Sequence, residues 1–121
     1  MATAPPKITL FGIPNCDTVK KARDWLTAHG HAYAFHNYKT DGVDKKYLEA
    51  WVKQAGWEAV LNRAGTTFRG LPETDKAALT ARRAVTLMCA QPSLIKRPVL
   101  ERGDLLLIGF KPALYAEALG G

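Results

Sequence analysis

Residues 8–26 read ITLFGIPNCDTVKKARDWL and join two different apolar patterns across a short break. The first five residues, ITLFG, are rich in strand formers and apolar on both faces, which is typical of a buried central strand. Pro14 ends this strand. From Asp17 the apolar residues recur at helical spacing, while the lysines and arginines between them face outward. The stretch therefore predicts a strand followed by an amphipathic helix, with Cys16 at the junction.

A second strand is expected directly after this helix. Gly30 is a natural helix C-terminus, and HAYAFHNY, residues 31–38, alternates weakly and carries aromatic side chains. Strand, helix and strand in this order form a βαβ unit, so the two strands should be parallel.

The middle of the chain is predicted to be helical. Asp44 opens a helix that ends near Gly56, and a short helical piece follows at residues 57–61. The glycines and proline of NRAGTTFRGLPE indicate a loop. A further helix is predicted from residue 73 or 74 to about residue 90, where Pro92 ends it.

The last part of the chain predicts a hairpin and a final helix. RPVLERGDLLLIGF, residues 97–110, contains two apolar runs around Gly103-Asp104, a hairpin-type turn. Pro112 suits the first turn of a helix. The whole order predicts an α/β protein of the thioredoxin-like class, with a mixed four-stranded sheet and a helical insertion between its βαβ and ββα halves. We expect a flexible tail over residues 1–6 and a single domain over residues 7–121.

Composition narrows the functional classes. The chain has 121 residues, and no apolar run is long enough to span a membrane or form a signal peptide. We therefore expect a cytoplasmic protein without membrane partners. The formal charge of +6 favours anionic partners, but the basic residues form no aromatic-interleaved stripe, so nucleic acid is not expected. The histidines and cysteines lack zinc-ligand spacing, and no metal site or bound cofactor is predicted.

Cys16 is the candidate nucleophile. The free N–H groups and the dipole of a helix N-terminus stabilise an anion, so a cysteine there forms a thiolate more readily than free cysteine does. Lys20 and Lys21 act in the same direction, whereas Asp17 opposes them. The alternative is that Cys16 is a small buried residue that fills the turn between strand and helix.

The sequence favours a mechanism with one cysteine. A dithiol oxidoreductase would need a second cysteine three residues after Cys16, where this chain has Val19. The intermediate must then be resolved by Cys89 or by an external thiol such as glutathione. Cys89 lies in an apolar helical stretch, where core packing is the better interpretation. An external thiol is therefore expected.

Basic residues supply a candidate anion site. Arg97 precedes Pro98 at the start of a strand, and in a thioredoxin-like fold a cis proline at this place faces the cysteine. The planar guanidinium suits a carboxylate or an oxyanion. Arg63, Arg69 and Lys111 could complete the site. The alternatives are a trans proline beside a solvated arginine, and ordinary surface charges at the other three positions.

Four segments together resemble the ArsC family of arsenate reductases that are coupled to glutathione and glutaredoxin. They are ITLFGIPNCDTVKKARDWL, LNRAGTTFR, PSLIKRPVL and LLLIGFKP. The branch most similar to them is that of the YffB thiol reductases, which is related to the Spx regulators. The resemblance covers the chain from Lys7 onward, and the motifs PNC and KRP occur in the family's order.

The resemblance implies roles for individual residues. Cys16 falls on the family's nucleophile, Arg63 and Arg97 fall on its anion-binding arginines, and Asn15 belongs to the same site. The third basic position holds Lys111, which keeps the charge and loses the bidentate geometry of arginine. The family's arsenate reductases carry a histidine-asparagine pair where this chain has Gly12-Ile13.

Three functions follow from the resemblance. The first is a glutathione-dependent thiol reductase, a monomer with glutathione as co-substrate and glutaredoxin as a further partner. Its nearest alternative is an arsenate reductase. The other is a non-catalytic regulator of the Spx type that binds the RNA polymerase alpha subunit. Spx proteins commonly carry a C-x-x-C switch, which Val19 removes here.

Overall fold

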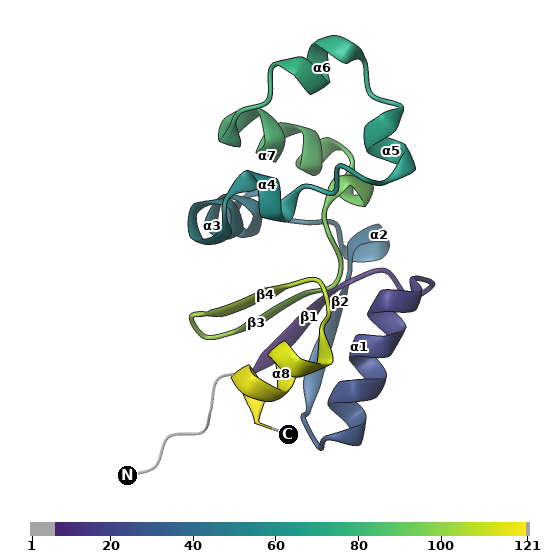
Figure 1. Ribbon diagram of the computed structural model, residues 1–121, viewed down its shortest axis with the longest axis vertical. Coiled ribbons are helices and arrows are strands. Elements are labelled where there is room, and N and C mark those ends of the chain that lie inside the picture. Colours follow the sequence, from purple (N-terminus) through teal and green to yellow (C-terminus); the bar gives the residue numbers. More distant parts are fainter. Residues whose placement is uncertain (1–6, 121) are drawn as a thin grey trace. The chain divides into compact units, whose positions relative to one another are not determined.

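The computed structural model describes residues 7–120, which form two compact units (Figure 1). The sheet unit combines residues 7–37 with residues 97–120, and the helical unit comprises residues 38–96. The tail expected over residues 1–6 lies outside the described residues, and the single domain over residues 7–121 stays a prediction. No helix in the described range is long and apolar enough to cross a membrane.

The strands of the sheet unit form a four-stranded mixed sheet within the described residues, in the order β2-β1-β3-β4. The strands are β1 (Ile8–Gly12), β2 (Tyr33–Asn37), β3 (Val99–Arg102) and β4 (Leu105–Ile108). β1 is parallel to β2 and antiparallel to β3, and β3 pairs with β4 in an antiparallel hairpin. The predicted thioredoxin-like arrangement is confirmed, and the apolar ITLFG is a central strand because it has a neighbour on each side.

Two helices, α1 (Asp17–Ala28) and α8 (Pro112–Leu119), pack against this sheet. A core cluster joins apolar side chains of β1 and β3 to side chains from both helices: Ile8, Leu10, Ala22, Leu26, Leu100, Tyr115 and Leu119. Each large apolar side chain that is fully buried contributes about 1.5–3 kcal/mol. This shared core fixes the helix N-termini relative to the sheet.

Gly30 ends α1 in the manner expected from the sequence. Its φ angle of 74° is in the left-handed region. The amide of Gly30 donates to the carbonyl of Thr27 at 3.1 Å, and the amide of His31 donates to that of Leu26 at 2.9 Å. These two hydrogen bonds form a Schellman motif, and the Trp25 ring stacks on the His31 ring beside them.

The hairpin between β3 and β4 turns at Gly103-Asp104, as predicted. Arg102 is paired with Leu105, so the loop has two residues, and Gly103 has a φ angle of 58°. A glycine with positive φ at the first loop position suits a two-residue hairpin turn.

The helical unit consists of short helices joined by tight turns. They are α2 (Tyr38–Asp41), α3 (Lys45–Ala55), α4 (Trp57–Val60), α5 (Thr66–Arg69), α6 (Glu73–Ala77), α7 (Ala81–Ala90) and the 3-10 helix η1 (Pro92–Leu94). Asp44 caps α3 as expected, because its carboxylate accepts a hydrogen bond from the amide of Lys46 at 3.0 Å. The buried side chains of the helical unit include Leu48, Trp51, Val60, Leu61, Ala84, Met88, Leu94 and Ile95.

Three predictions for this region were wrong in part. The helix expected from residue 73 to residue 90 is two helices, because the hydroxyl of Thr80 caps α7 by accepting a hydrogen bond from the amide of Arg83 at 3.2 Å. The segment expected to be a loop contains one helical turn, α5. The strand expected over residues 31–38 ends at Asn37, and Tyr38 begins α2.

Candidate active site

Cys16 is the N-cap residue of α1. Its backbone is extended, with φ −107° and ψ 125°, and its carbonyl accepts a hydrogen bond from the amide of Lys20 at 2.9 Å. The thiol makes no capping hydrogen bond to the helix, and the residue is half-buried. The side chain therefore lies at the N-terminus of a helix of 12 residues, beside backbone N–H groups that have no partner within the helix.

The position three residues after Cys16 belongs to the core. Val19 is fully buried, and a Cβ added to Gly12 would lie 2.8 Å from Val19 Cγ2. Only glycine lets the end of β1 approach the first turn of α1 this closely. Sequence reasoning did not single out Gly12 for this role, although a glycine that ends a strand pattern is a signal of close backbone approach.

The sheet register brings three segments of the candidate site to one end of the sheet. Phe11 pairs with Val99, and Val99 pairs with Ile108. The chain leaves β1 toward Cys16 at this end, enters β3 from Pro98, and leaves β4 toward Lys111. The sheet register therefore places Cys16, Pro98 and Lys111 at the same end of the sheet.

Pro98 is buried, and the Arg97-Pro98 peptide bond is cis, as expected from the sequence. The carbonyl of Pro98 accepts a hydrogen bond from the amide of Gly109 at 2.8 Å. This contact ties the start of β3 to the segment that follows β4. Arg97 itself is half-buried.

Lys111 is the N-cap residue of α8, and its side chain is exposed. Its carbonyl accepts hydrogen bonds from the amides of Leu114 at 3.0 Å and Tyr115 at 3.1 Å. Pro112 occupies the first turn, as predicted. The Lys111 ammonium therefore accompanies a second helix N-terminus at the same end of the sheet as Cys16. Asn15, which precedes Cys16, is also exposed.

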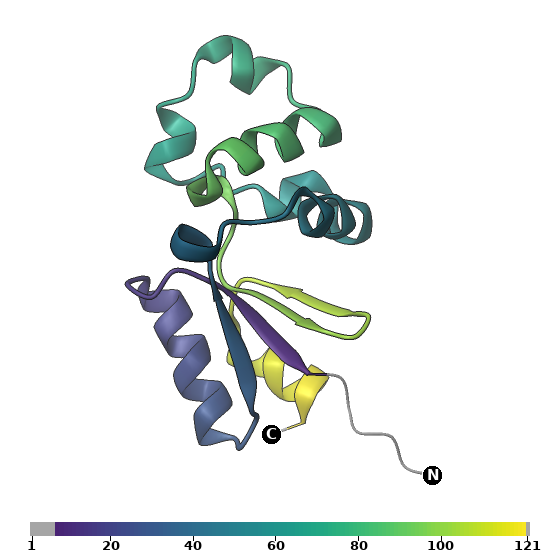
Figure 2. The same ribbon diagram turned by 180° about the vertical axis from the view of Figure 1, so that it is seen from behind.

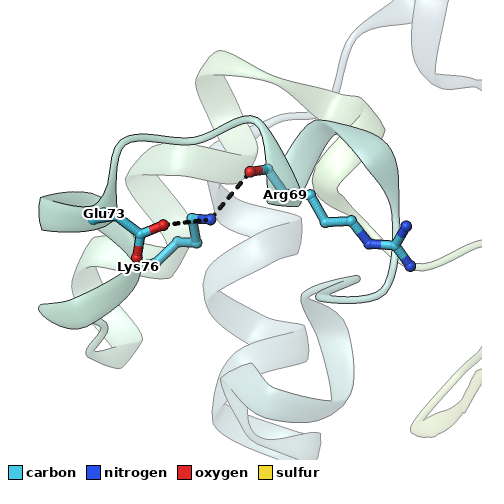
Figure 3. A network of polar contacts seen from close by, with 3 residues as sticks. All are labelled: Arg69, Glu73 and Lys76. Atoms are coloured by element: carbon cyan, nitrogen blue, oxygen red, sulfur yellow. Dashed lines mark hydrogen bonds and ion pairs between the residues drawn. The ribbon is translucent and has the colours of Figure 1, made fainter.

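The other two arginines lie in the helical unit and are exposed. The Arg63 guanidinium lies 5.6 Å from the centre of the Trp57 ring, within cation–π distance. The carbonyl of Arg69 accepts a hydrogen bond from Lys76 Nζ at 3.0 Å, and Lys76 also pairs with Glu73 at 3.1 Å. Figure 3 shows the Arg69 side chain extending away from Lys76 and Glu73.

Cys89, the second cysteine, is a half-buried residue of α7. Burial raises the pKa of its thiol, and the charge of Lys45 offsets this only in part, while Glu49 and Asp44 add to the rise. A raised pKa lowers the thiolate fraction at neutral pH and makes Cys89 a poor nucleophile. Within residues 7–120, no three His, Cys, Asp or Glu side chains converge as a metal ion requires.

The fold and the place of the cysteine define a class. A mixed four-stranded sheet, a cysteine at the N-terminus of the first helix and a proline before the antiparallel strand together describe a protein with a thioredoxin-like fold. Residues 11–118 match the ArsC family, and the chain belongs to this family.

Three similar proteins illustrate the range of this family. The solved structure of a YFFB protein is 57% identical, with a TM-score of 0.91, and the match covers 93% of this chain and 99% of that one. An arsenate reductase (ArsC) related protein from Brucella melitensis is 52% identical, with a TM-score of 0.76, over 96% and 97% of the two chains. The global transcriptional regulator Spx of Streptococcus agalactiae is 31% identical over 85% of this chain and 76% of its own length.

Proposed function

We propose that this protein is a glutathione-dependent thiol reductase in which Cys16 is the nucleophile. The observation that carries the proposal is the placement of Cys16 at a helix N-terminus, at the same end of the sheet as Pro98 and Lys111. The match to the ArsC family supports a reductase of this class. Cys89 is not needed, because its raised pKa disfavours the thiolate.

The reaction is an exchange of disulfides. The Cys16 thiolate attacks the glutathione sulfur of a mixed disulfide between glutathione and a substrate thiol. A bond forms between Cys16 Sγ and the glutathione sulfur, and the substrate leaves as a thiolate and takes up a proton. A second glutathione thiolate then attacks the glutathione sulfur on Cys16. Oxidised glutathione leaves, and the Cys16 thiolate is restored.

The basic residues are proposed to bind the carboxylates of glutathione. Arg97 and Lys111 belong to the sheet unit with Cys16, and Arg63 and Asn15 complete the set that the family implies. The planar group of Arg97 accommodates a carboxylate through two hydrogen bonds, while Lys111 acts as a point charge. Glutaredoxin is the proposed macromolecular partner, and we expect a cytoplasmic monomer.

Arsenate reduction is the closest alternative within this proposal. The Brucella relative is an arsenate reductase related protein. Against arsenate as the substrate stand Gly12-Ile13 and Lys111, where the family's arsenate reductases have other residues. Gly12 is moreover required by its contact with Val19. We therefore propose weak or absent arsenate turnover.

The test is glutathionylation followed by intact mass. Wild type and Cys89→Ser should gain one glutathione from oxidised glutathione and lose it again to reduced glutathione, whereas Cys16→Ser should gain none. Arg97→Ala should slow the exchange about tenfold and Lys111→Ala about threefold, because only arginine engages a carboxylate through two hydrogen bonds. An internal disulfide between Cys16 and Cys89 contradicts the single-cysteine mechanism. Brisk arsenite production with glutathione and glutaredoxin favours arsenate reductase instead.

A second candidate function is regulation of transcription, because the match to Spx covers most of the chain. In this case the protein would bind the RNA polymerase alpha subunit and turn over no disulfide. A pull-down with purified alpha subunit, using wild type and Cys16→Ser, separates the two functions. Binding by both proteins without glutathione exchange favours the regulator.

A further inference from the structure

The strand β2 and the helix α1 border a hollow that the proposed reductase site does not use. Among the described residues, β2 pairs with β1 on one side and ends the sheet on the other. The helix α1 lies beside β2 in both views (Figure 1, Figure 2). The hollow has a volume of about 370 Å³, within the usual range for small-molecule sites. Its lining residues are Pro14, Lys20, Arg23, Asp24, Thr27 and Tyr33.

Four of the lining residues form one stripe along α1. They are spaced three and four residues apart, the spacing at which side chains on a helix are neighbours. The stripe consists of Lys20, Arg23, Asp24 and Thr27. Tyr33 and Phe35 occupy alternate positions of β2 and pack against the core cluster shared with α1, so both face this helix. The hollow therefore lies where a polar stripe of α1 meets the aromatic side chains of β2.

Arg23 is held in place by these two aromatic side chains. Its Nε donates a hydrogen bond to the hydroxyl of Tyr33 at 3.1 Å, and its guanidinium carbon lies 4.3 Å from the centre of the Phe35 ring. Arg23 is half-buried, and both contacts order its planar group. Its two Nη atoms have no hydrogen-bond or ion-pair partner among the described residues. Arg23 therefore presents a fixed pair of donors to the hollow.

The hollow also offers one further cation and one acid. Lys20 lies about 4.5 Å before Arg23 along the helix axis, and Asp24 follows Arg23 directly. Within residues 7–120, neither Lys20 nor Asp24 forms an ion pair. A simple anion at Arg23 would be repelled by Asp24. A ligand group that carries both a negative and a positive charge has a partner for each of them.

We propose that this hollow binds an α-amino acid group, in which one carbon atom carries both a carboxylate and an ammonium. The carboxylate accepts hydrogen bonds from the two Nη atoms of Arg23, with Lys20 as a second cation, and the ammonium donates to Asp24. Two kinds of ligand carry this group: a free amino acid, and glutathione at its γ-glutamyl end. The glutathione source rests on the proposed function, whereas the free amino acid does not.

The experiment is an amide NMR titration of the full chain with two compounds that cannot form a disulfide. L-Glutamine has the same side-chain amide as a γ-glutamyl group, and S-methylglutathione has a blocked sulfur. Saturable shifts in α1 and β2 are expected. N-Acetylglutamine, which lacks the ammonium, and acetate should each bind about tenfold more weakly than glutamine, because Asp24 then opposes them. Tighter binding of S-methylglutathione than of glutamine assigns the site to glutathione, and equal or weaker binding assigns it to free amino acids.

Variants locate the site. Arg23→Lys keeps the charge and loses the paired donors, so it should weaken glutamine binding about tenfold. Asp24→Asn should weaken glutamine about fivefold and leave N-acetylglutamine no weaker, a pattern that loss of folding does not produce. Lys21→Gln is the matched control, because it removes one charge from the same helix at an exposed position outside the hollow.

Three results would overturn the proposal: equal binding of glutamine and N-acetylglutamine, equal effects of Lys21→Gln and Arg23→Lys, or no saturable shifts in α1 and β2. Neither probe reacts with Cys16, so a failure here leaves the glutathionylation of Cys16 unaffected. A failure of that reaction, in turn, leaves the binding of glutamine unaffected.

Discussion

Replacing Tyr115 by phenylalanine is predicted to stabilise the protein. Tyr115 is 1% exposed, and its hydroxyl has no hydrogen-bond partner among the described residues. Its ring makes edge contacts with Trp25 and Phe110, at 5.5 and 4.7 Å between centres, and phenylalanine preserves both. The substitution therefore removes only a buried polar group that is not satisfied.

The size of this effect follows from desolvation. A buried hydroxyl without a partner costs about 1–3 kcal/mol. The small space that the oxygen leaves offsets part of the gain, so we expect Tyr115→Phe to raise the free energy of unfolding by about 1 kcal/mol at pH 7. Tyr33→Phe is the matched control. It removes a phenol that accepts a hydrogen bond from Arg23 Nε at 3.1 Å, and it should cost about 0.5–1.5 kcal/mol.

The pH dependence gives a second readout for Tyr115. Burial raises the pKa of its phenol above the ordinary value near 10. The unfolded chain therefore ionises Tyr115 at a lower pH than the folded protein does. The contribution of Tyr115 protonation to the free energy of unfolding is therefore fully present below pH 10, and it is lost as the pH rises further. Phenylalanine has no such loss, so the advantage of Tyr115→Phe should grow above pH 10, by at most about 1.4 kcal/mol per pH unit.

The assay is urea unfolding followed by circular dichroism at pH 7 and at several values above pH 10, for wild type and both variants. The other ionisable groups are the same in wild type and Tyr115→Phe, so their contributions cancel in the difference. A loss of more than 1 kcal/mol at pH 7 in Tyr115→Phe, or a difference that stays constant above pH 10, refutes the reasoning.

Two further predictions concern Gly12 and Cys89. Gly12→Ala should lower the free energy of unfolding by about 1–3 kcal/mol, because the new methyl group would meet Val19 at 2.8 Å. The control is Gly70→Ala, whose Cβ would lie 3.5 Å from its nearest neighbour. Equal urea midpoints for the two variants would contradict the prediction. Alkylation of Cys89 in the folded protein should rise only at higher pH than in the urea-unfolded chain, since burial raises its pKa. Mass spectrometry of the Cys89 peptide measures this, and coincident pH profiles would show that burial has no effect.

The sheet unit could be predicted from the sequence because its signals are local and strong. The apolar ITLFG, the helical spacing after Asp17, Gly30 and the Gly103-Asp104 turn each fix one element, and the order of elements then limits the topology. The helical unit was harder to predict because its boundaries depend on weak caps. The Thr80 hydroxyl splits a helix that its apolar pattern would continue, and single turns such as α5 leave almost no periodicity.

The candidate site was predictable in its residues and less so in its arrangement. Cys16 could be placed at a helix start from the pattern alone, Pro98 from the thioredoxin-like order of elements, and Lys111 from its position before the last helix. The register that brings these segments to one end of the sheet depends on pairings between distant parts of the chain, such as Phe11 with Val99. The contact of Gly12 with Val19 depends on distances that spacing does not encode.

The pairing of β1 with β3 has a consequence for biosynthesis. The helical unit is continuous in sequence, so all of its residues have been synthesised before β3 leaves the ribosome. β1 and β2 can pair early, but the other edge of β1 stays open until Val99 and the residues after it emerge. We therefore expect the sheet to close last, since contacts between distant residues form slowly. A nascent chain that pauses before residue 97 would expose the open edge of the apolar strand β1, to which a chaperone or a second nascent chain could bind.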